Sequence, residues 1–427
     1  MARCDKWLTF TSCLLHQFFV SGTLKANGIF VASIVQHFRT NHTIVAWAFG
    51  LQSGLIYLMS PVTRLLLRRF SHRKLSIFGG LFAGLGYIYC GLFASEVWQM
   101  FISVAISGAG LGIADLPHYL ALKQHFKQDF PKISTLASLF HFVGVATLPP
   151  IAQYLKDMYG LQGALLIMGA IIWNNIAGGF AIIRTPVDET DDGIPEWNSN
   201  SEEGGCSEMK IGLSENKLTW SDKYLPCLSL MFRHRNFPYL MTIEGIAFYI
   251  YTSWALFLVT LGVTQGLSDD QAALLPTVGG VAGAMGRLFA TALFHFDKMN
   301  PYMSSAIPFL VNGVTMLTSP FVTNFFLLAT LSAFSGFSQG LNQSSILGIL
   351  PSIVCHGHFA QAAVIGFSMD GIMMQLGGLV SGVIYDVMGS VIYVFWFNAI
   401  VCFIVVPLAF LWGYRKTPLE ECSRDEY

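Results

Sequence analysis

Long apolar runs recur along almost the whole chain. A helix that spans a bilayer needs about 20 predominantly apolar residues, and the runs have this length. We predict twelve spanning helices, at 7–37, 43–66, 74–93, 98–122, 132–154, 162–184, 236–262, 270–296, 302–319, 323–351, 359–385 and 390–414. The pattern therefore predicts an all-α membrane protein.

One polar segment, 185–235, interrupts the apolar pattern. It is rich in acidic residues, glycine, serine and asparagine, a composition typical of a disordered linker. It separates six predicted spans from six others. We therefore expect an N-terminal six-helix bundle at 1–184, an acidic linker at 185–235, a C-terminal six-helix bundle at 236–414 and a short tail at 415–427.

The first run is similar in part to a secretory signal peptide, because Arg3 and Lys6 precede an apolar stretch. However, His16 and Gln17 interrupt this stretch, and its removal would leave an odd number of spans. We therefore expect it to remain as the first membrane helix.

Composition supports a membrane protein and excludes several other classes. Hydrophobic residues make up 53% of the chain and charged residues 11%, whereas soluble domains carry about 25% charged residues. A net charge of −1 gives no sign of a nucleic-acid partner. The eight cysteines form no Cys-x-x-Cys pair, so we expect no zinc site, disulfide framework or cofactor. No His-Glu-x-x-His motif or other catalytic constellation indicates an enzyme.

The distribution of lysine and arginine predicts the orientation. Five positive residues lie between Arg64 and Lys74, and most of the chain's 24 lysines and arginines fall on the same side once both termini are placed in the cytoplasm. Cytoplasmic loops carry this excess of positive charge. We predict a multi-pass protein of the plasma membrane with both termini cytoplasmic.

A short repeat relates the two predicted bundles. Asp157-Met-Tyr-Gly160 closes the fifth span, and Asp386-Val-Met-Gly389 closes the eleventh. These are equivalent positions in two six-helix halves, as expected for a parallel repeat.

Several stretches, in order and at regular spacing over nearly the whole chain, resemble the monocarboxylate transporter family of the major facilitator superfamily. They are Ser21-Gly-Thr-Leu-Lys25, Gly110-Leu-Gly-Ile113, Gln124-His-Phe-Lys127, Gly160-Leu-Gln-Gly163 and the run from Phe334 to Ser345. The resemblance implies the major facilitator fold and transport of a small carboxylate by alternating access, coupled to a proton. For some relatives it also implies a single-span accessory glycoprotein. The family's acidic-Gly-Gly-Trp-Gly-Trp opening is missing, which marks a divergent member.

Two basic residues lie in the interior of predicted spans, away from their ends, where a charge costs at least about 2.5–3.5 kcal/mol. Lys25 and Arg287 match a lysine and an arginine of the family, and the resemblance implies that they bind the substrate carboxylate. An arginine can hold a carboxylate through two parallel hydrogen bonds. The alternatives are that Lys25 snorkels to the surface and that Arg287 forms a structural ion pair.

Three acidic residues also lie in predicted spans and are candidates for proton coupling. The family usually has an aspartate one turn before the arginine, where this chain has Gly283. Asp370 can hold a proton if buried, because burial disfavours a charged carboxylate, or it can neutralise Arg287 or Lys25. For Asp115 and Glu244 two interpretations stay open: each is either a second proton site or a buried, hydrogen-bonded structural residue.

Uncharged residues complete the candidate site. Tyr57 matches a substrate-facing tyrosine of the family, and Gln339 and Gln343 are amides in the tenth span. Amides there favour a more polar substrate than lactate, or alternatively form hydrogen bonds to neighbouring helices.

Two other functions stay open: a carrier of zwitterions such as amino acids or creatine-like or carnitine-like compounds, and a non-transporting scaffold or sensor. Asn41 begins a glycosylation sequon, but its loop is short and close to the bilayer.

Overall fold

The structure is a computed structural model that describes residues 2–67, 69–126, 130–182, 237–295, 303–353 and 359–414. Within these residues every regular element is a helix. The predicted linker at 185–235 and tail at 415–427 lie outside the described residues. The helices are α1 (Ala2–His37), α2 (His42–Leu58), α3 (Ser60–Leu67), α4 (His72–Phe93), α5 (Val97–Phe126), α6 (Phe130–Ile172), α7 (Asn174–Ala181), α10 (Phe237–Thr264), α11 (Asp269–His295), α12 (Met303–Thr318), η2 (Ser319–Phe321), α13 (Phe325–Ile353), α14 (Phe359–Met388) and α15 (Val391–Tyr414).

The described helices form the predicted twelve passes. Nine helical segments among the described residues are long and apolar enough to cross a membrane. One of them, the segment from α6 through α7, makes two passes because Gly160 breaks the helix, with φ 67° and ψ −176°. The shorter α12 and the long α13 supply the remaining two. Large apolar side chains such as Phe93, Phe326 and Val387 are exposed, as expected for a surface that faces lipid.

The Asp-x-x-Gly repeat has a structural basis. Gly160 and Gly389 have φ values of 67° and 70°, in the left-handed region that other residues rarely adopt. A glycine in this conformation ends a helix. The repeat therefore marks the turn between the fifth and sixth passes in one half, and between α14 and α15 in the other.

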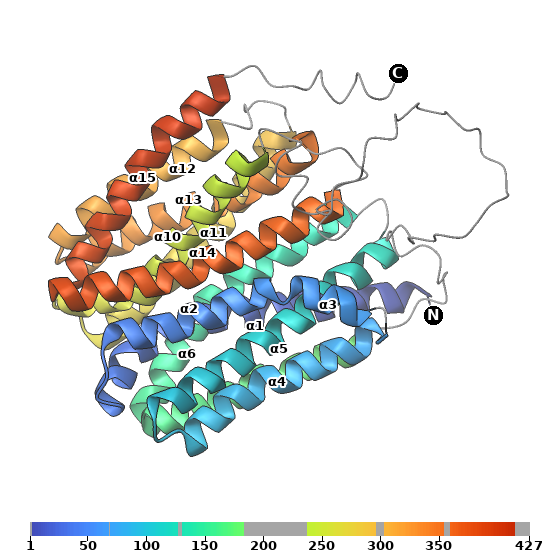
Figure 1. The fold of residues 1–427 in the computed structure, drawn as a ribbon, viewed down its shortest axis with the longest axis horizontal. Helices are drawn as coiled ribbons and strands as arrows, with labels where there is room; N and C mark the ends of the chain where they lie inside the picture. The colour runs from blue at the N-terminus through green and yellow to red at the C-terminus, as the bar shows by residue number, and fades with distance from the viewer. Residues whose placement is uncertain are drawn as a thin grey trace, which may run out of the picture.

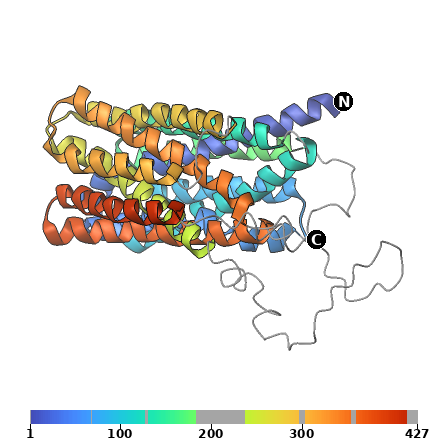
Figure 2. The same ribbon diagram turned by 90° about the horizontal axis from the view of Figure 1, so that it is seen from above.

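The two halves lie side by side with their helices roughly parallel, the N-terminal half drawn in blue and green and the C-terminal half in yellow to red (Figure 1, and from above in Figure 2). The start of α1 and the end of α15 lie at the same end of the bundle, which we call the terminal end. The opposite end, where α1 ends and α2 begins, is the far end. Across the interface α1 contacts α10, α2 contacts α14, and α6 contacts α11.

Polar contacts join the two halves at the far end. Asp386, near the end of α14, accepts hydrogen bonds from the backbone N–H groups of His42 and Thr43 at 3.1 and 2.7 Å. It also contacts His42 Nδ1 at 3.2 Å and accepts from Thr43 Oγ1 at 2.6 Å. Lys156 and Asp269 form a second bridge at 3.6 Å. The Asn41 side chain is a helix cap, and its Oδ1 accepts from the N–H of Ile44 at 3.0 Å.

Candidate substrate-binding site

Lys25 lies in the middle of the bundle and is 1% exposed. Its Nζ atom lies 3.7 Å from the centre of the Tyr251 ring and 4.0 Å from that of Trp254, both on α10. Among the described residues Nζ has no hydrogen-bond partner. Lys25 therefore does not snorkel to the surface. Aromatic faces stabilise an ammonium group, but they leave its hydrogen-bond donors free for an anion.

Tyr251 of the C-terminal half also contacts a second helix of the N-terminal half, α6. Its hydroxyl group lies 3.3 Å from Nε2 of His141 on α6. The backbone oxygen of His141 in turn accepts a hydrogen bond of 2.6 Å from Ser21, one turn before Lys25 on α1. Helices α1, α6 and α10 are therefore fixed to one another around the lysine.

Arg287 on α11 belongs to the same region and is 8% exposed. Its Nη1 donates a hydrogen bond of 3.3 Å to the backbone oxygen of Ser138, and its guanidinium group lies 5.5 Å from the centre of the Phe142 ring. Arg287 interacts electrostatically with the phenol groups of Tyr57, Tyr119 and Tyr251. Both Lys25 and Arg287 act electrostatically on His141. The structure thus brings the two predicted cations into one neighbourhood.

Gly283 occupies a crowded position one turn before Arg287. A Cβ atom there would overlap the Phe142 ring of α6, and the Gly283 backbone oxygen lies against Gly340 of α13. An aspartate side chain at this position would require the Phe142 ring to move. The change from the family's usual aspartate therefore goes together with close packing of α11 on α6 and α13.

Asp370 and Glu244 lie close together at the contact between α14 and α10. Asp370 is 1% exposed, and neither of its carboxylate oxygens has a hydrogen-bond partner among the described residues. It interacts electrostatically with Glu244. Glu244 Oε2 lies 3.8 Å from the position that a Cβ would take on Gly366, one turn before Asp370. Asp370 therefore does not neutralise Lys25 in this structure, and the two acids lie beside each other.

Asp115 on α5 has partners on the first helix. Its Oδ1 lies 3.1 Å from His16 Nε2 and accepts a weak hydrogen bond of 3.4 Å from Gln17. Tyr119, one turn further along α5, interacts electrostatically with both Asp115 and Arg287. The phenol of Tyr119 is thus near enough to interact with both the acid and the arginine.

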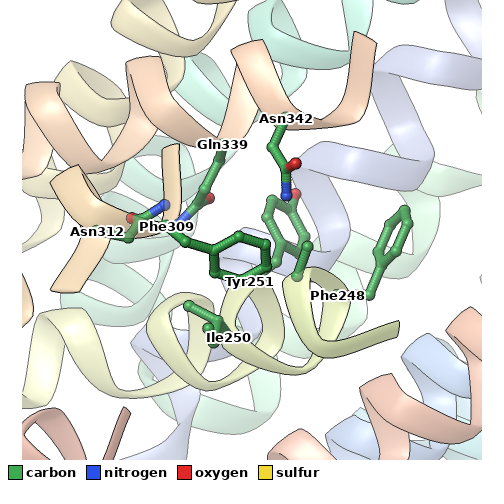
Figure 3. A pocket seen from close by; sticks show the side chains of 8 residues that line it. Phe248, Ile250, Tyr251, Phe309, Asn312, Gln339 and Asn342 are labelled. Carbon is green, nitrogen blue, oxygen red and sulfur yellow. The ribbon is translucent and has the colours of Figure 1, made fainter. Parts of the chain in front are cut away.

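A pocket adjoins Tyr251 in the C-terminal half (Figure 3). Its empty volume is about 370 Å³, including space open to solvent. None of its lining residues is charged, and three carry amides; they are Ala247, Phe248, Ile250, Tyr251, Phe309, Asn312, Gln339 and Asn342. Oδ1 of Asn342 is buried without a hydrogen-bond partner among the described residues. The pocket therefore offers an unused acceptor beside the ring that supports Lys25.

Of the three uncharged residues predicted for the site, two have described side chains, Tyr57 and Gln339. The Tyr57 ring packs 5.5 Å from Phe248, which lines the pocket, and 6.1 Å from Phe367 of α14. Gln339 lines the pocket and donates a weak hydrogen bond of 3.4 Å to Ser335. The side chain of Gln343 lies outside the described residues.

The sequence prediction missed Tyr251, Trp254, His141 and Asn312. Tyr251 and Trp254 are three residues apart in the seventh span, a spacing that places them on one helix face. His141 is a titratable residue in an apolar span. The sequence shows these residue types and spacings. It does not show that the seventh span packs against Lys25.

Comparison with known proteins establishes the family. The sequence profile of the Major Facilitator Superfamily matches residues 13–311, well over half of the chain. The chain belongs to this superfamily. Together with the all-helical fold, this defines a secondary transporter and not an enzyme.

Among its relatives are monocarboxylate transporters. The chain is 25% identical to human monocarboxylate transporter 2 over 414 residues, which cover 95% of this chain and 84% of that protein. It is 24% identical to monocarboxylate transporter 4 of Rattus norvegicus, over 91% of this chain and 79% of that protein. The predicted resemblance to this family is confirmed.

Solved transporters share the fold. The nucleoside transporter NupG matches with a TM-score of 0.75 at 11% identity, over 96% of this chain and all of that one. A bacterial homologue of the lysosomal transporter Spinster matches with a TM-score of 0.72 at 10% identity, over 97% and 99% of the two chains. The predicted fold of twelve helices in two six-helix bundles agrees with these matches.

Proposed function

We propose that the protein carries a small monocarboxylate across the plasma membrane by alternating access, with both termini in the cytoplasm. The observation that supports this most strongly is the Lys25 ammonium group, which is buried on two aromatic rings without a hydrogen-bond acceptor. A carboxylate is the ligand that such a group lacks, because a buried charge is costly unless it is paired. The names of the relatives agree with this substrate class.

Arg287 is the second anchor in this proposal. It lies with Lys25 around His141 and Tyr251 and can add a bidentate contact. A bound carboxylate neutralises part of the local positive charge. This lowers the cost of moving the site between the two membrane faces, since the reorienting bundle then carries less unpaired charge through a low-dielectric interior.

The amide-lined pocket supports a substrate with an uncharged polar body. Asn312, Gln339 and Asn342 can donate and accept hydrogen bonds, whereas none of the lining residues is charged. A hydroxyl or carbonyl group near the carboxylate would find partners there. We therefore place hydroxylated monocarboxylates, such as glycerate and 3-hydroxybutyrate, ahead of purely apolar ones.

A zwitterion is the second candidate substrate. The unpartnered carboxylate oxygens of Asp370, beside Glu244, favour it because they can pair with the cationic group of a zwitterion. In this case Lys25 binds the carboxylate of the substrate. Asp370 and Glu244, which we call the acid pair, bind its cationic end. Competition for uptake separates the candidates: carnitine, creatine and amino acids compete in the zwitterion case, and hydroxylated monocarboxylates compete in the first.

The test is uptake of radiolabelled lactate, glycerate and 3-hydroxybutyrate into proteoliposomes. We expect Lys25→Gln and Arg287→Gln each to lower uptake by about tenfold or more, because each removes a charged partner of the carboxylate. Lys74→Gln and Arg69→Gln remove the same charges from exposed positions and should leave uptake unchanged. Normal uptake by both site variants would show that the carboxylate binds elsewhere.

The same preparation distinguishes a carrier from a scaffold or sensor. A sensor is stabilised against heat by its ligand but passes none across the bilayer. Thermal shifts with these carboxylates, without flux into the liposomes, would contradict the proposal. If surface delivery in cells is low, co-expression of a single-span accessory glycoprotein tests the remaining partner that the family resemblance implies.

A further inference from the structure

A histidine pair with an aspartate lies between the candidate substrate site and the terminal end. His16 is nine residues before Lys25 on α1, which is a separation of about 13 Å along the helix. It is 0% exposed, and its Nε2 lies 3.1 Å from Oδ1 of Asp115. The Asp115 side chain is 21% exposed. The pair therefore joins a fully buried base to an acid that solvent can reach.

The neighbouring His118 has a fixed protonation pattern. Its Nδ1 lies 2.6 Å from the backbone oxygen of Ala114, and since a carbonyl only accepts, Nδ1 carries the hydrogen. Its Nε2 is buried without a hydrogen-bond partner among the described residues. The ring is stacked on that of His16, with centres 4.4 Å apart and planes 9° apart. Two stacked imidazolium ions repel each other, so the stack holds one added proton at most.

The surroundings of His16 suit both of its charge states. Its Nδ1 lies 3.0 Å from Nδ2 and 3.3 Å from Oδ1 of Asn175 on α7. When His16 is neutral and Nε2–H donates to Asp115, the amide N–H can donate to Nδ1. When Nδ1 is protonated, the amide oxygen can accept from it. His16 can therefore gain or lose a proton without losing a hydrogen bond.

We propose that His16, held by Asp115, is the proton-binding site of the transport cycle. The inference rests on the proposed function as a carboxylate carrier and names its coupling ion and its place. The proton arrives from water at the partly exposed Asp115, is held on the His16 imidazole, and leaves to water on the other side after reorientation. It takes the place of a proton-coupling aspartate at position 283.

Charge explains the coupling to substrate. Protonated His16 adds a positive charge to the half that carries Lys25, which favours carboxylate binding, and a bound carboxylate favours protonation by the same factor. Other titratable groups that interact with the pair are Cys13, Tyr57, His118 and Tyr119, with His141, Tyr251, Lys25 and Arg287 beyond them. Helix α7 contributes Asn175 and no titratable side chain.

The experiment compares net uptake with exchange in proteoliposomes, with whichever of lactate, glycerate or 3-hydroxybutyrate the wild type takes up fastest. An inward proton gradient should stimulate wild-type uptake. His16→Asn keeps a donor toward Asp115 but binds no proton, and it should lose the stimulation while substrate counterflow stays within about threefold of wild type. His37→Asn makes the same change at an exposed position of α1 and should retain the stimulation.

Several results would overturn the inference. Gradient stimulation that survives in His16→Asn, or that disappears only in Glu244→Gln or Asp370→Asn, would place the proton at the acid pair. Wild-type uptake without any proton stimulation would remove coupling and leave the carrier function intact. Absence of wild-type uptake of all three carboxylates would instead reject the proposed function.

A second measurement decides the matter if His16→Asn fails to fold. Asp115→Asn should show the same loss of stimulation. In weakly buffered detergent solution, the wild-type protein should take up protons when the transported carboxylate is added, since binding and protonation are linked. No proton uptake there would contradict the inference without any variant.

Discussion

The contact between Lys25 and Tyr251 has a consequence for single substitutions. Tyr251 supports the ammonium with its ring and contacts His141 with its hydroxyl group. A buried cation–π contact is worth about 2 kcal/mol, and its loss removes this support from the ammonium group. We expect Tyr251→Leu to raise the KM for carboxylate uptake by about tenfold or more, and Tyr251→Phe by about threefold or less. Initial rates over a range of substrate concentrations give both values.

The neighbouring tyrosine provides a control for this prediction. Tyr249 is also buried on α10, but its hydroxyl group interacts with Ser381 of α14 and not with His141. Tyr249→Phe should leave KM unchanged. Equal effects of Tyr251→Phe and Tyr251→Leu would show that the hydroxyl bond to His141, and not the ring, positions the lysine.

A network of buried amides in the N-terminal half is expected to stabilise the fold. Asn27 donates to Gln52 at 2.9 Å, the Tyr87 hydroxyl group donates to Asn27 at 2.5 Å, and Gln52 contacts Ser107 at 3.2 Å. Helices α1, α2, α4 and α5 meet there. We expect Tyr87→Phe to lower the free energy of unfolding by about 1 kcal/mol, because it leaves Asn27 without a donor. Thermal unfolding in detergent, with Tyr89→Phe at an exposed position as the control, measures this loss.

At the scale of helices, α11 and α13 approach each other through glycine. A Cβ on Gly336 or Gly340 would collide with the backbone of Gly279 or Gly283. Backbone atoms cannot rotate away as a side chain can, so the helices must separate. We expect Gly336→Ala to lower the free energy of unfolding by about 1–3 kcal/mol. Thr330→Ala on the exposed side of α13 should have little effect, and an unchanged melting temperature for Gly336→Ala would contradict the prediction.

The helices were predictable because the length of an apolar run is a local property. Predicted spans such as 98–122 and 390–414 fall within a few residues of α5 and α15. The cost of a charge in lipid likewise identified Lys25, Arg287 and Asp370 from single positions. The partners were not predictable, because they depend on which helices pack together. Nothing in the sequence near Lys25 indicates Trp254, and nothing near Asp115 indicates Asn175 as the group that orients His16.

At the scale of the whole molecule, two unequal polar contacts among the described residues join the halves at the far end. Asp386 makes two backbone and two side-chain contacts at the start of α2, where the helix dipole favours a negative charge. The bridge from Lys156 to Asp269 is a single contact to a side chain that is 58% exposed, and such pairs contribute about 0–1 kcal/mol. Opening of the far end, which is extracellular in the proposed orientation, must break both contacts.

Loss of the Asp386 contacts should therefore shift the protein toward a state that is open at the far end. Ser53 is buried on α2, one turn from Tyr57 toward the far end and on the same face of the helix. In a Ser53→Cys background, we expect Asp386→Ala to speed labelling by an impermeant maleimide from the extracellular side by about tenfold. Asp269→Ala should change the rate by about twofold or less, because it removes only the exposed bridge. Equal rates in the two variants would mean that Asp386 caps α2 without controlling access, and a faster rate in Asp269→Ala would make the exposed bridge the stronger closure.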